Sequence, residues 1–199
     1  MPQPPGHVLS TESLVQRAVA GDRQAFAELY ERYLTRVYRY IYYLTGGTAD
    51  VEDLTAQTFL RAWQKVPDFR PRGHAFVAWL LRIAHNVAVS HLRKRHNEQQ
   101  GIPSDYQDTS RASHPDQLAQ DASEAEKVRA AILALTPAER EVIVLRFVDG
   151  LSYAEAAQAL GRNVNAIRVA QWRALTHLRS ILSEHIERPA TAAPGKAKP

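Results

Sequence analysis

Hydrophobic side chains recur at the spacing of an α-helix through most of this chain. Between residues 24 and 44 they follow one another mainly at steps of three and four: Phe26, Leu29, Tyr30, Tyr33, Val37, Tyr40, Ile41 and Leu44. This spacing gathers the side chains on one face of a helix, which Gly46 and Gly47 then end. We predict a long amphipathic helix whose aromatic stripe is part of a hydrophobic core rather than a ligand site.

The same spacing predicts further helices over residues 13–20, 50–66 and 75–95. The helix over residues 50–66 has an apolar face made of Val51, Leu54, Thr55, Thr58, Phe59, Ala62 and Val66. Its opposite face carries acidic residues first and basic residues last, an order that the helix dipole favours. A solvated face therefore explains these charges by default, without any binding partner.

The periodicity lapses between residues 97 and 123, where Gln, Asp, Ser and Pro are frequent. We predict a flexible, mildly acidic linker that divides the chain into two helical domains. The second domain is expected to open with a helix over residues 124–135. A capped helix start at Thr136–Glu139 follows, and Gly150 ends that helix. The residues expected to be buried in these two helices are Val128, Ile132, Leu135, Val142, Ile143 and either Leu145 or Phe147.

The stretch from residue 151 to residue 179 has the pattern of a helix-turn-helix. Ser152 and Glu155 form a capping box, and Gly161 allows a left-handed turn. Asn163 can then cap a second, longer helix. That helix presents a set of side chains suited to a DNA major groove: Asn165, Arg168, Val169, Trp172 and Arg173. An ordinary helical hairpin buried in a larger domain explains the same pattern, so both interpretations stay open at this point.

A second polar stripe lies on the helix predicted over residues 75–95. It consists of Arg82, Asn86, Ser90 and Arg93, with Trp79 beside it. Residues 82–96 contain no acidic residue, and a polar loop over residues 68–74 precedes the helix. Cations neutralise phosphates and aromatic rings stack on bases, so this face suits a nucleic-acid strand. The helix dipole explains basic residues near a helix end equally well.

Composition narrows the class of protein. The chain has 199 residues, 45% of them hydrophobic, and a net charge of +4, which permits a polyanionic partner without requiring one. It contains no cysteine, so disulfides and thiolate metal sites are excluded and a reducing cytoplasm is the expected location. We expect no signal peptide, because the first residues lack a basic segment followed by an apolar run. We also expect no membrane insertion, because no segment approaches the ~20 apolar residues that span a bilayer.

No catalytic or metal-ligating constellation is apparent in the sequence. The spacing of His85, His91 and His96 does not bring two imidazoles onto one helical turn. The chain also lacks a Gly-rich phosphate loop and a plausible catalytic triad. We therefore predict no cofactor, no metal and no enzymatic activity.

Several segments together resemble the bacterial extracytoplasmic-function (ECF) sigma factors. Three resemble sigma region 2: its opening, its most recognisable helix (Asp50 to Trp63) and its promoter-melting segment. Two more resemble sigma region 4. In family order, the segments are residues 25–40, 50–63, 76–86, 135–146 and 150–155.

The resemblance implies an all-α fold of two small helical domains, sigma region 2 and sigma region 4, joined by a flexible linker. The expected parts are a tail with a short helix (1–21), region 2 (22–96), the linker (97–123), region 4 with the helix-turn-helix (124–185) and a disordered tail (186–199).

The resemblance also implies a function. A sigma factor binds core RNA polymerase, directs promoter-specific transcription initiation, reads two promoter elements and helps to open the duplex. By resemblance, the residues that dock on the clamp of the largest polymerase subunit are Asp50, Glu52, Asp53, Gln57 and Arg61, which replaces the default of a solvated face. Those that hold the melted non-template strand at the minus-ten element are Phe69, Arg70, Arg72, His74, Trp79, Arg82, Asn86, Arg93, Lys94 and Arg95. Those that read the minus-thirty-five duplex are Arg162, Asn163, Asn165, Ala166, Arg168, Val169, Gln171, Trp172 and Arg173. The flap of the second-largest subunit and an anti-sigma factor are further implied partners.

Three positions depart from the family pattern. Ser90 stands where an acidic residue is usual, Asn165 and Ala166 replace a common small-residue/Thr pair, and Ala170 stands where a second basic residue is frequent. The promoter sequence therefore cannot be copied from relatives. The competing hypothesis is a conventional regulator that binds duplex DNA as a dimer through residues 151–179, which would leave residues 50–63 without a role.

Overall fold

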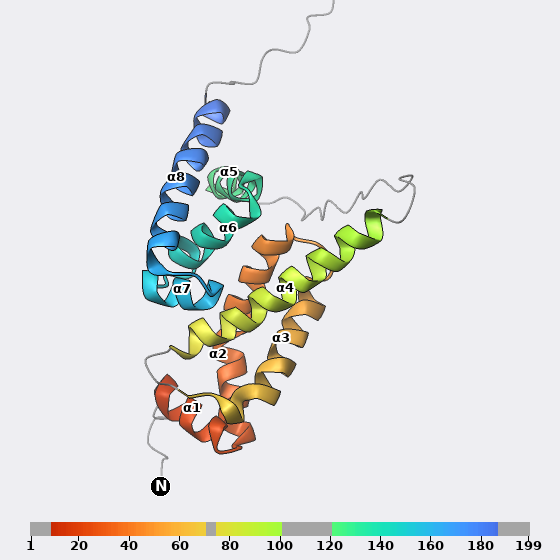
Figure 1. Cartoon of the computed structure of the whole chain (residues 1–199), viewed down its shortest axis with the longest axis vertical. Helices are drawn as coiled ribbons and strands as arrows, with labels where there is room; N and C mark the ends of the chain where they lie inside the picture. Colours follow the sequence, from red (N-terminus) through yellow and green to blue (C-terminus); the bar gives the residue numbers. More distant parts are fainter. Residues whose placement is uncertain (1–8, 71–74, 101–120, 187–199) are drawn as a thin grey trace, which may run out of the picture.

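The computed structural model describes residues 9–70, 75–100 and 121–186, and all regular secondary structure in these ranges is helical (Figure 1). The N-terminal bundle consists of α1 (Thr11–Val19), α2 (Arg23–Thr45), α3 (Val51–Lys65), the 3₁₀ turn η1 (Val66–Asp68) and α4 (Phe76–Gln100). The C-terminal bundle consists of α5 (Asp121–Ala134), α6 (Pro137–Ile143), its π-helical continuation η2 (Val144–Val148), α7 (Tyr153–Leu160) and α8 (Val164–Ile186). The predicted all-α class is confirmed. The predicted tails at 1–8 and 187–199, and residues 101–120 of the predicted linker, lie outside the described residues.

Short polar side chains set where the first two helices begin. The Ser10 hydroxyl accepts a hydrogen bond from the amide of Ser13 at 3.2 Å. The Asp22 carboxylate accepts from the amides of Gln24 and Ala25 at 2.9 and 3.1 Å. These bonds satisfy amides that have no partner within a helix, so the sequence fixes these helix starts locally.

The apolar faces of α2, α3 and α4 meet in one core. All residues predicted for the inner face of α3 are buried. Within the stripe predicted for α2, Val37, Tyr40 and Ile41 are fully buried. Phe26 and Tyr33 are half-buried, and Tyr30 is 38% exposed, yet its ring packs edge-on against Phe59 with centroids 4.6 Å apart. The aromatic stripe is therefore core, as predicted.

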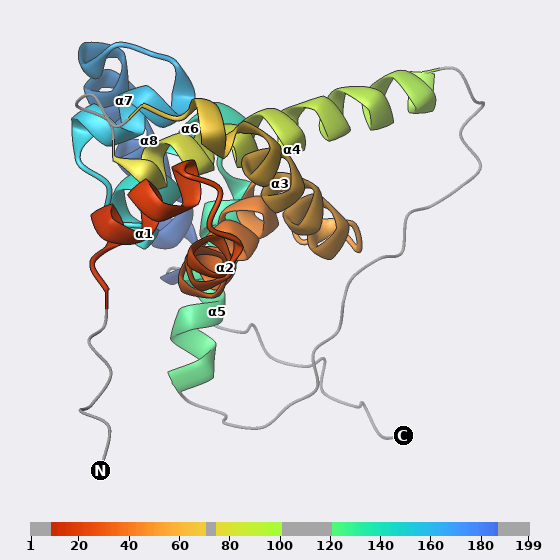
Figure 2. The ribbon, with the colours of Figure 1, turned by 90° about the horizontal axis from the view of Figure 1, so that it is seen from below.

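Helix α4 is longer than predicted and is buried only over its first half. Leu80, Leu81 and Ala84 are at most 1% exposed, whereas the carboxyl-terminal half extends beyond the other helices (Figure 2). The helix passes the predicted end at residue 95 because residues 96–100 contain no Gly or Pro to stop it. No helix within the described ranges combines the length and the apolar character needed to cross a bilayer.

For the C-terminal bundle, the structure corrects one predicted buried residue and decides between two alternatives. Ile132 and Leu135 are buried, but Val128 is 46% exposed, so its predicted burial is wrong. The reason is that the first part of α5 projects from the bundle (Figure 2), and residues 126–130 are all exposed. Of the two alternatives after α6, Leu145 is buried and Phe147 is 56% exposed.

The two bundles pack directly on each other. Helix α7 lies against α4, and α2 reaches α6 and η2 (Figure 1). Arg140 of α6 illustrates the contact: its guanidinium donates to the carbonyl of Tyr43 in α2 at 3.2 Å and to that of Leu135 at the end of α5 at 2.9 Å. The composition of the linker is compatible with both a packed and an open arrangement, and this structure is the packed one.

Truncation of a core side chain on α4 should destabilise the fold. We expect Leu81→Ala to lower the free energy of unfolding by about 2–5 kcal/mol, because the removed atoms leave a cavity. Leu60→Ala on α3 is the matched control, since Leu60 is 57% exposed, and it should change stability by less than about 0.5 kcal/mol. Urea unfolding followed by circular dichroism measures both, and equal losses would contradict the burial of Leu81.

Candidate nucleic-acid interface

The turn between α7 and α8 is built from local capping. The Ser152 amide donates to the Glu155 carboxylate at 2.8 Å, and the Glu155 amide donates to the Ser152 hydroxyl at 3.2 Å. Hydrogen bonding of the Glu155 carboxylate to the Ser152 side chain, and then to the Ser152 amide, holds the pKa of Glu155 below its ordinary value. Gly161 then ends α7 at φ +64°, a conformation that a side chain would strain. The predicted helix-turn-helix is therefore present, with the predicted cap and turn residues.

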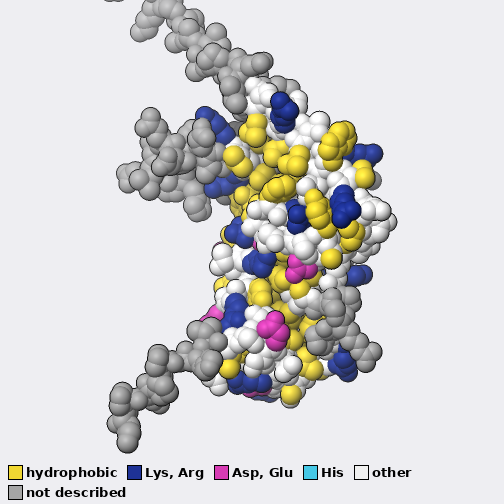
Figure 3. Space-filling view, turned by 90° about the vertical axis from the view of Figure 1, so that its left-hand side faces the viewer, with side chains coloured by type: hydrophobic (Ala, Val, Ile, Leu, Met, Phe, Trp, Pro, Cys, Tyr) yellow, Lys and Arg dark blue, Asp and Glu magenta, His cyan; other side chains and the backbone are white. Residues whose placement is uncertain are grey.

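Helix α8 is oriented by the burial of one face. Asn163 caps it by accepting the Ala166 amide at 2.7 Å, and Ile167 and Ala174 are fully buried. The opposite face is therefore solvent-exposed, with Trp172 69% exposed and Val169 50% exposed. The other exposed members of the predicted set are Arg162, Asn163, Asn165, Ala166, Arg168 and Arg173. Figure 3 looks at the side of the molecule on which α8 lies, and its upper part shows apolar side chains interspersed with Lys and Arg.

A cluster around Tyr153 fixes the direction of α8 relative to α7. The guanidiniums of Arg146 and Arg168 lie 4.0 and 5.3 Å from the centre of the Tyr153 ring. The Gln171 amide donates to the Tyr153 hydroxyl at 3.1 Å, and Arg146 Nε donates to the Gln171 side-chain oxygen at 3.1 Å. Arg168 is therefore held by a cation–π contact, and Gln171 is engaged within the protein.

Sequence reasoning did not find Tyr153 or Arg146 as part of this site. Arg146 belongs to η2, Tyr153 to α7 and Arg168 to α8. Helical periodicity relates residues only within one helix, so no pattern in the sequence signals a contact among three of them.

Two more predicted residues at the start of α8 have structural partners. Arg162 donates to the buried Glu141 carboxylate at 3.2 Å, and the Asn163 side-chain oxygen accepts the capping hydrogen bond of α8. Beside them a hollow of about 570 Å³ opens between α6 and α8, lined by Glu139, Asn165 and Arg173 among others. The exposed face of α8 therefore continues through this hollow to the beginning of α6.

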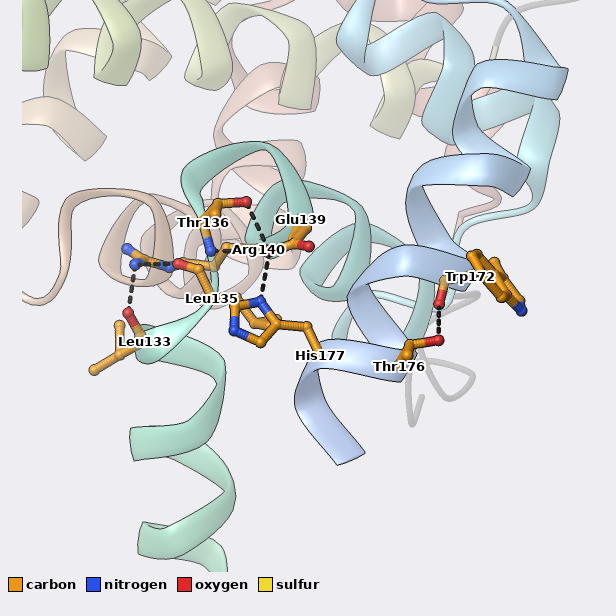
Figure 4. A network of polar contacts seen from close by, with 8 residues as sticks. All are labelled: Leu133, Leu135, Thr136, Glu139, Arg140, Trp172, Thr176 and His177. Carbon is orange, nitrogen blue, oxygen red and sulfur yellow. Dashed lines mark hydrogen bonds and ion pairs between the residues drawn. The ribbon is translucent and has the colours of Figure 1, made fainter. Parts of the chain in front are cut away.

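Glu139 ties the start of α6 to the middle of α8 (Figure 4). It accepts hydrogen bonds from the Thr136 amide and hydroxyl at 3.1 and 2.7 Å, and it lies 3.0 Å from His177 Nδ1. Burial alone would raise the pKa of Glu139, but the bonds from Thr136 and His177 outweigh it and lower that pKa. Directly before His177 along α8, the Thr176 hydroxyl donates to the Trp172 carbonyl one turn earlier at 3.0 Å.

The stripe predicted on α4 is exposed as a set. Arg82, Asn86, Ser90, Arg93 and Lys94 all lie on the solvent side. Arg82 also donates to the Gln158 carbonyl of α7 at 3.4 Å and lies beside Gly161. The face is therefore open to solvent, and α7 touches it at Arg82.

The aromatic residues at the beginning of α4 form a cluster. Trp79 is half-buried, with its ring centroid 4.9 Å from that of Phe69 and 5.4 Å from that of Phe76. Phe69 is only 5% exposed, so its ring packs against Trp79 and is not presented to solvent. Arg70 is exposed and donates to the Pro67 carbonyl at 3.0 Å. Arg72 and His74 of the predicted set lie outside the described residues.

The outer face of α3 carries the remaining predicted residues. Glu52, Asp53 and Gln57 are exposed and Arg61 is half-buried. Asp50 lies 3.2 Å from His91 Nε2 and 3.7 Å from Arg95, both on α4. Asp50 and Arg95 therefore connect α3 to α4, and the exposed acidic surface is made by Glu52 and Asp53.

The chemistry that the site offers is that of binding to nucleic acid. It joins cationic and aromatic side chains on two separate helices, which suits phosphates and base edges. Within the described ranges, no group of three or more Asp, Glu, His or Cys side chains is arranged to hold a metal ion.

Comparison with known proteins gives a consistent result. Residues 29–98 match Sigma-70 region 2, and residues 125–178 match Sigma-70, region 4. The ECF RNA polymerase sigma factor BldN of Streptomyces coelicolor is 39% identical over 173 residues, which are 86% of this chain and 65% of BldN. The ECF RNA polymerase sigma factor SigE of Mycolicibacterium smegmatis is 33% identical, over 87% of this chain and 68% of SigE. This chain thus spans about two thirds of the length of these relatives.

A solved structure has a similar fold. It is the sigma factor RpoE in complex with the anti-sigma factor NepR from Bartonella quintana. The TM-score is 0.67 at 28% identity, and the similarity covers 79% of this chain and 96% of that one.

The Glu139 contacts predict a pH dependence. Because the pKa of Glu139 is lowered from its ordinary 4.5, its ionised form stabilises the fold above that value, and the contribution is lost as the pH falls through the lowered pKa. The stability difference between the wild type and Glu139→Gln should therefore shrink as the pH falls from about 6 to about 3.5. Glu31→Gln, at an exposed position on α2, serves as the control in urea unfolding. A Glu139→Gln difference that is constant with pH would contradict this role.

Proposed function

The chain belongs to the ECF RNA polymerase sigma factors, which direct promoter-specific transcription initiation, and we propose that it does so through three surfaces, on α8, α4 and α3. The observation that carries the proposal is the exposed face of α8. There Arg168, Trp172 and Arg173 project from a helix fixed by its cap and by the Tyr153 cluster.

Helix α8 reads the minus-thirty-five duplex in this proposal. Arginine can bond bidentately to guanine, and apolar side chains contact the thymine methyl group. Arg168 and Arg173 can bond guanine, Val169 and Trp172 can contact the thymine methyl group, and Asn165 can bond adenine. Arg162 and Gln171 orient the helix, since both are bonded within the protein.

Helix α4 holds the melted non-template strand at the minus-ten element. Its exposed cations, Arg82, Arg93 and Lys94, can neutralise phosphates. Asn86 lies in the same stripe, and Trp79 is half-exposed at its beginning. Extruding a base costs a few kcal/mol, which stacking and edge hydrogen bonds in such a pocket offset.

Helix α3 docks on the clamp of the largest polymerase subunit. Glu52, Asp53 and Gln57 give it an exposed, mainly acidic face that no other helix covers within the described part of the chain. An acidic face is complementary to a basic partner and steers its approach. The C-terminal bundle would meet the flap of the second-largest subunit.

The remaining partners follow from the same role. Chemistry at the promoter belongs to the polymerase, so this chain needs no catalytic residue or cofactor, and it works in the cytoplasm where the polymerase is. RpoE, of similar fold, binds an anti-sigma factor, and we extend that class of partner to this chain.

Charge reversal on α3 tests the docking surface. Asp53→Arg should weaken binding to purified bacterial core RNA polymerase by about tenfold or more, while the free energy of unfolding changes by less than about 0.5 kcal/mol because the residue is exposed. The matched control is Glu12→Arg, an equal charge change at an exposed position of α1. Titration of labelled core enzyme measures both affinities. Undiminished affinity of Asp53→Arg would remove the docking claim.

Removal of one arginine on α8 tests promoter reading. Arg168→Ala should weaken promoter use by about 1–3 kcal/mol, with a loss that depends on one base position, if the residue reads a base edge. Arg179→Ala, three turns further along the same helix, is the control. Run-off transcription from genomic fragments, followed by substitution of the promoter found, measures both. A uniform loss over all sequences would reassign Arg168 to a phosphate, and duplex binding without polymerase binding would indicate a conventional regulator instead.

A further inference from the structure

The ring of Tyr153 lies beside two guanidinium groups that differ in their surroundings. Arg146 lies 4.0 Å from the ring centre, and it also donates to the Leu151 carbonyl and, at 3.1 Å, to the Gln171 side-chain oxygen. Arg168 lies 5.3 Å from the same ring centre, and within the described residues its side chain makes no hydrogen bond or ion pair. Arg146 is therefore fixed by several groups of the protein, whereas the orientation of Arg168 depends on the ring.

The ring itself is held at both of its ends. Its backbone end is fixed because Tyr153 is the first residue of α7 and directly follows the capping residue Ser152. At the other end, the Tyr153 hydroxyl accepts a hydrogen bond from the Gln171 amide at 3.1 Å. Gln171 follows Arg168 by three residues on α8, so the two side chains are neighbours on one side of that helix. The hydrogen bond therefore keeps the ring on the side of α8 from which Arg168 projects.

Arg168 occupies the part of α8 that is suited to base contacts. Helix α8 begins at Val164, and in a helix-turn-helix the first residues of the second helix contact base edges. An unrestrained arginine has many rotamers and can reach a phosphate as well as a base, whereas bidentate bonding to guanine needs one orientation of the planar group. Only the contact with a base carries sequence information. A ring that restricts the guanidinium therefore influences which of the two contacts Arg168 makes.

We propose that Tyr153 is a positioning residue for promoter reading, because its ring holds the Arg168 guanidinium in the orientation that reads one base pair. Gln171 and Arg146 hold the ring, and Tyr153 acts on the DNA through Arg168. The effect on promoter reading rests on the proposed function, whereas the hold of the ring on Arg168 is a property of the free chain.

The size of the expected effect follows from the strength of the ring contact. A side chain that is already held in its bound orientation loses less conformational freedom on binding. A cation–π contact at an exposed site corresponds to about two- to fivefold in an equilibrium constant. Tyr153→Leu should therefore reduce the preference for the base pair that Arg168 reads by about two- to fivefold. The preference at positions read by Arg173 should stay the same, since that residue lies more than one turn further along α8.

The first measurement tests the ring contact in the free full-length protein. Heteronuclear NMR spectra resolve the Nε–H groups of arginine side chains, and Arg168→Lys identifies the Arg168 signal by its loss. In the wild type, this signal should be displaced by the nearby ring and should show restricted motion. Tyr153→Leu should remove both effects, whereas Tyr153→Phe keeps the ring and should retain them. Tyr38→Leu, at a 40% exposed tyrosine of α2, is the matched control and should leave the signal unchanged.

The second measurement tests promoter reading with core RNA polymerase. Purified core enzyme is combined with each full-length variant, and transcription is measured from templates that carry every possible base pair at each position of the minus-thirty-five element. Tyr153→Leu should weaken the preference at the position where Arg168→Ala weakens it, and at no other position. The double variant Tyr153→Leu, Arg168→Ala should be as selective as Arg168→Ala alone, because the ring acts through the arginine. Tyr153→Phe should retain the wild-type preference.

A purely structural role of Tyr153 would give different results. If the ring only supports the fold, Tyr153→Leu lowers the preference at all positions and its effect adds to that of Arg168→Ala, and either result would overturn the positioning role. An Arg168 signal that is the same in the wild type and in Tyr153→Leu would also overturn it. If the wild type does not direct transcription by the polymerase, the proposed function fails, while the arginine spectra still decide whether Tyr153 holds Arg168.

Discussion

The structure depends on how α4 is covered. Over its first half this helix must bury apolar side chains on several sides at once, against α2 and α3 on one side and α7 on another. Leu80, Leu81 and Ala84 leave almost no exposed area, and removing such area from water is the main favourable contribution to folding. What remains exposed is a narrow stripe through Arg82 and Asn86. The same helix therefore organises the N-terminal bundle, presents the face proposed to bind the non-template strand and provides the surface on which the C-terminal bundle rests.

The exposed face of α8 depends on local contacts and on tertiary contacts in different ways. Ser152, Gly161 and Asn163 determine where helices end and begin, and each acts over a few residues. The direction in which the face points is determined by contacts across helices: the burial of Ile167 and Ala174, and the bonds of Tyr153 with Gln171 and of Glu139 with His177. Capping alone would leave α8 free to rotate about its axis, whereas these side-chain contacts fix one rotation. A recognition helix needs both, because base contacts depend on position to within a hydrogen-bond length.

The contact between the bundles combines a shared apolar core with polar contacts. One apolar core runs through both bundles, and polar contacts at its edge add arginines, a carboxylate and backbone carbonyls that connect α2 to η2 and α4 to α7. Apolar interfaces lose their full transfer free energy on separation, whereas polar groups regain hydration. A polar contact can therefore be specific in geometry and still be exchanged for a partner.

The sequence by itself determined the helical class, most helix boundaries, the capping residues and which residues of α3 and α8 face outward. Those features follow from hydrophobic period and local hydrogen bonding, which neighbouring residues decide. The sequence did not predict that Val128 is exposed or that Phe69 is buried among aromatic rings. It also did not predict that Arg162 and Gln171 form hydrogen bonds within the protein. Only the tertiary structure decided these, and it alone brought Arg36 and Arg39 to Asp149. The reason is physical: these contacts join residues far apart in the chain, and no periodicity within one helix records what another helix will cover.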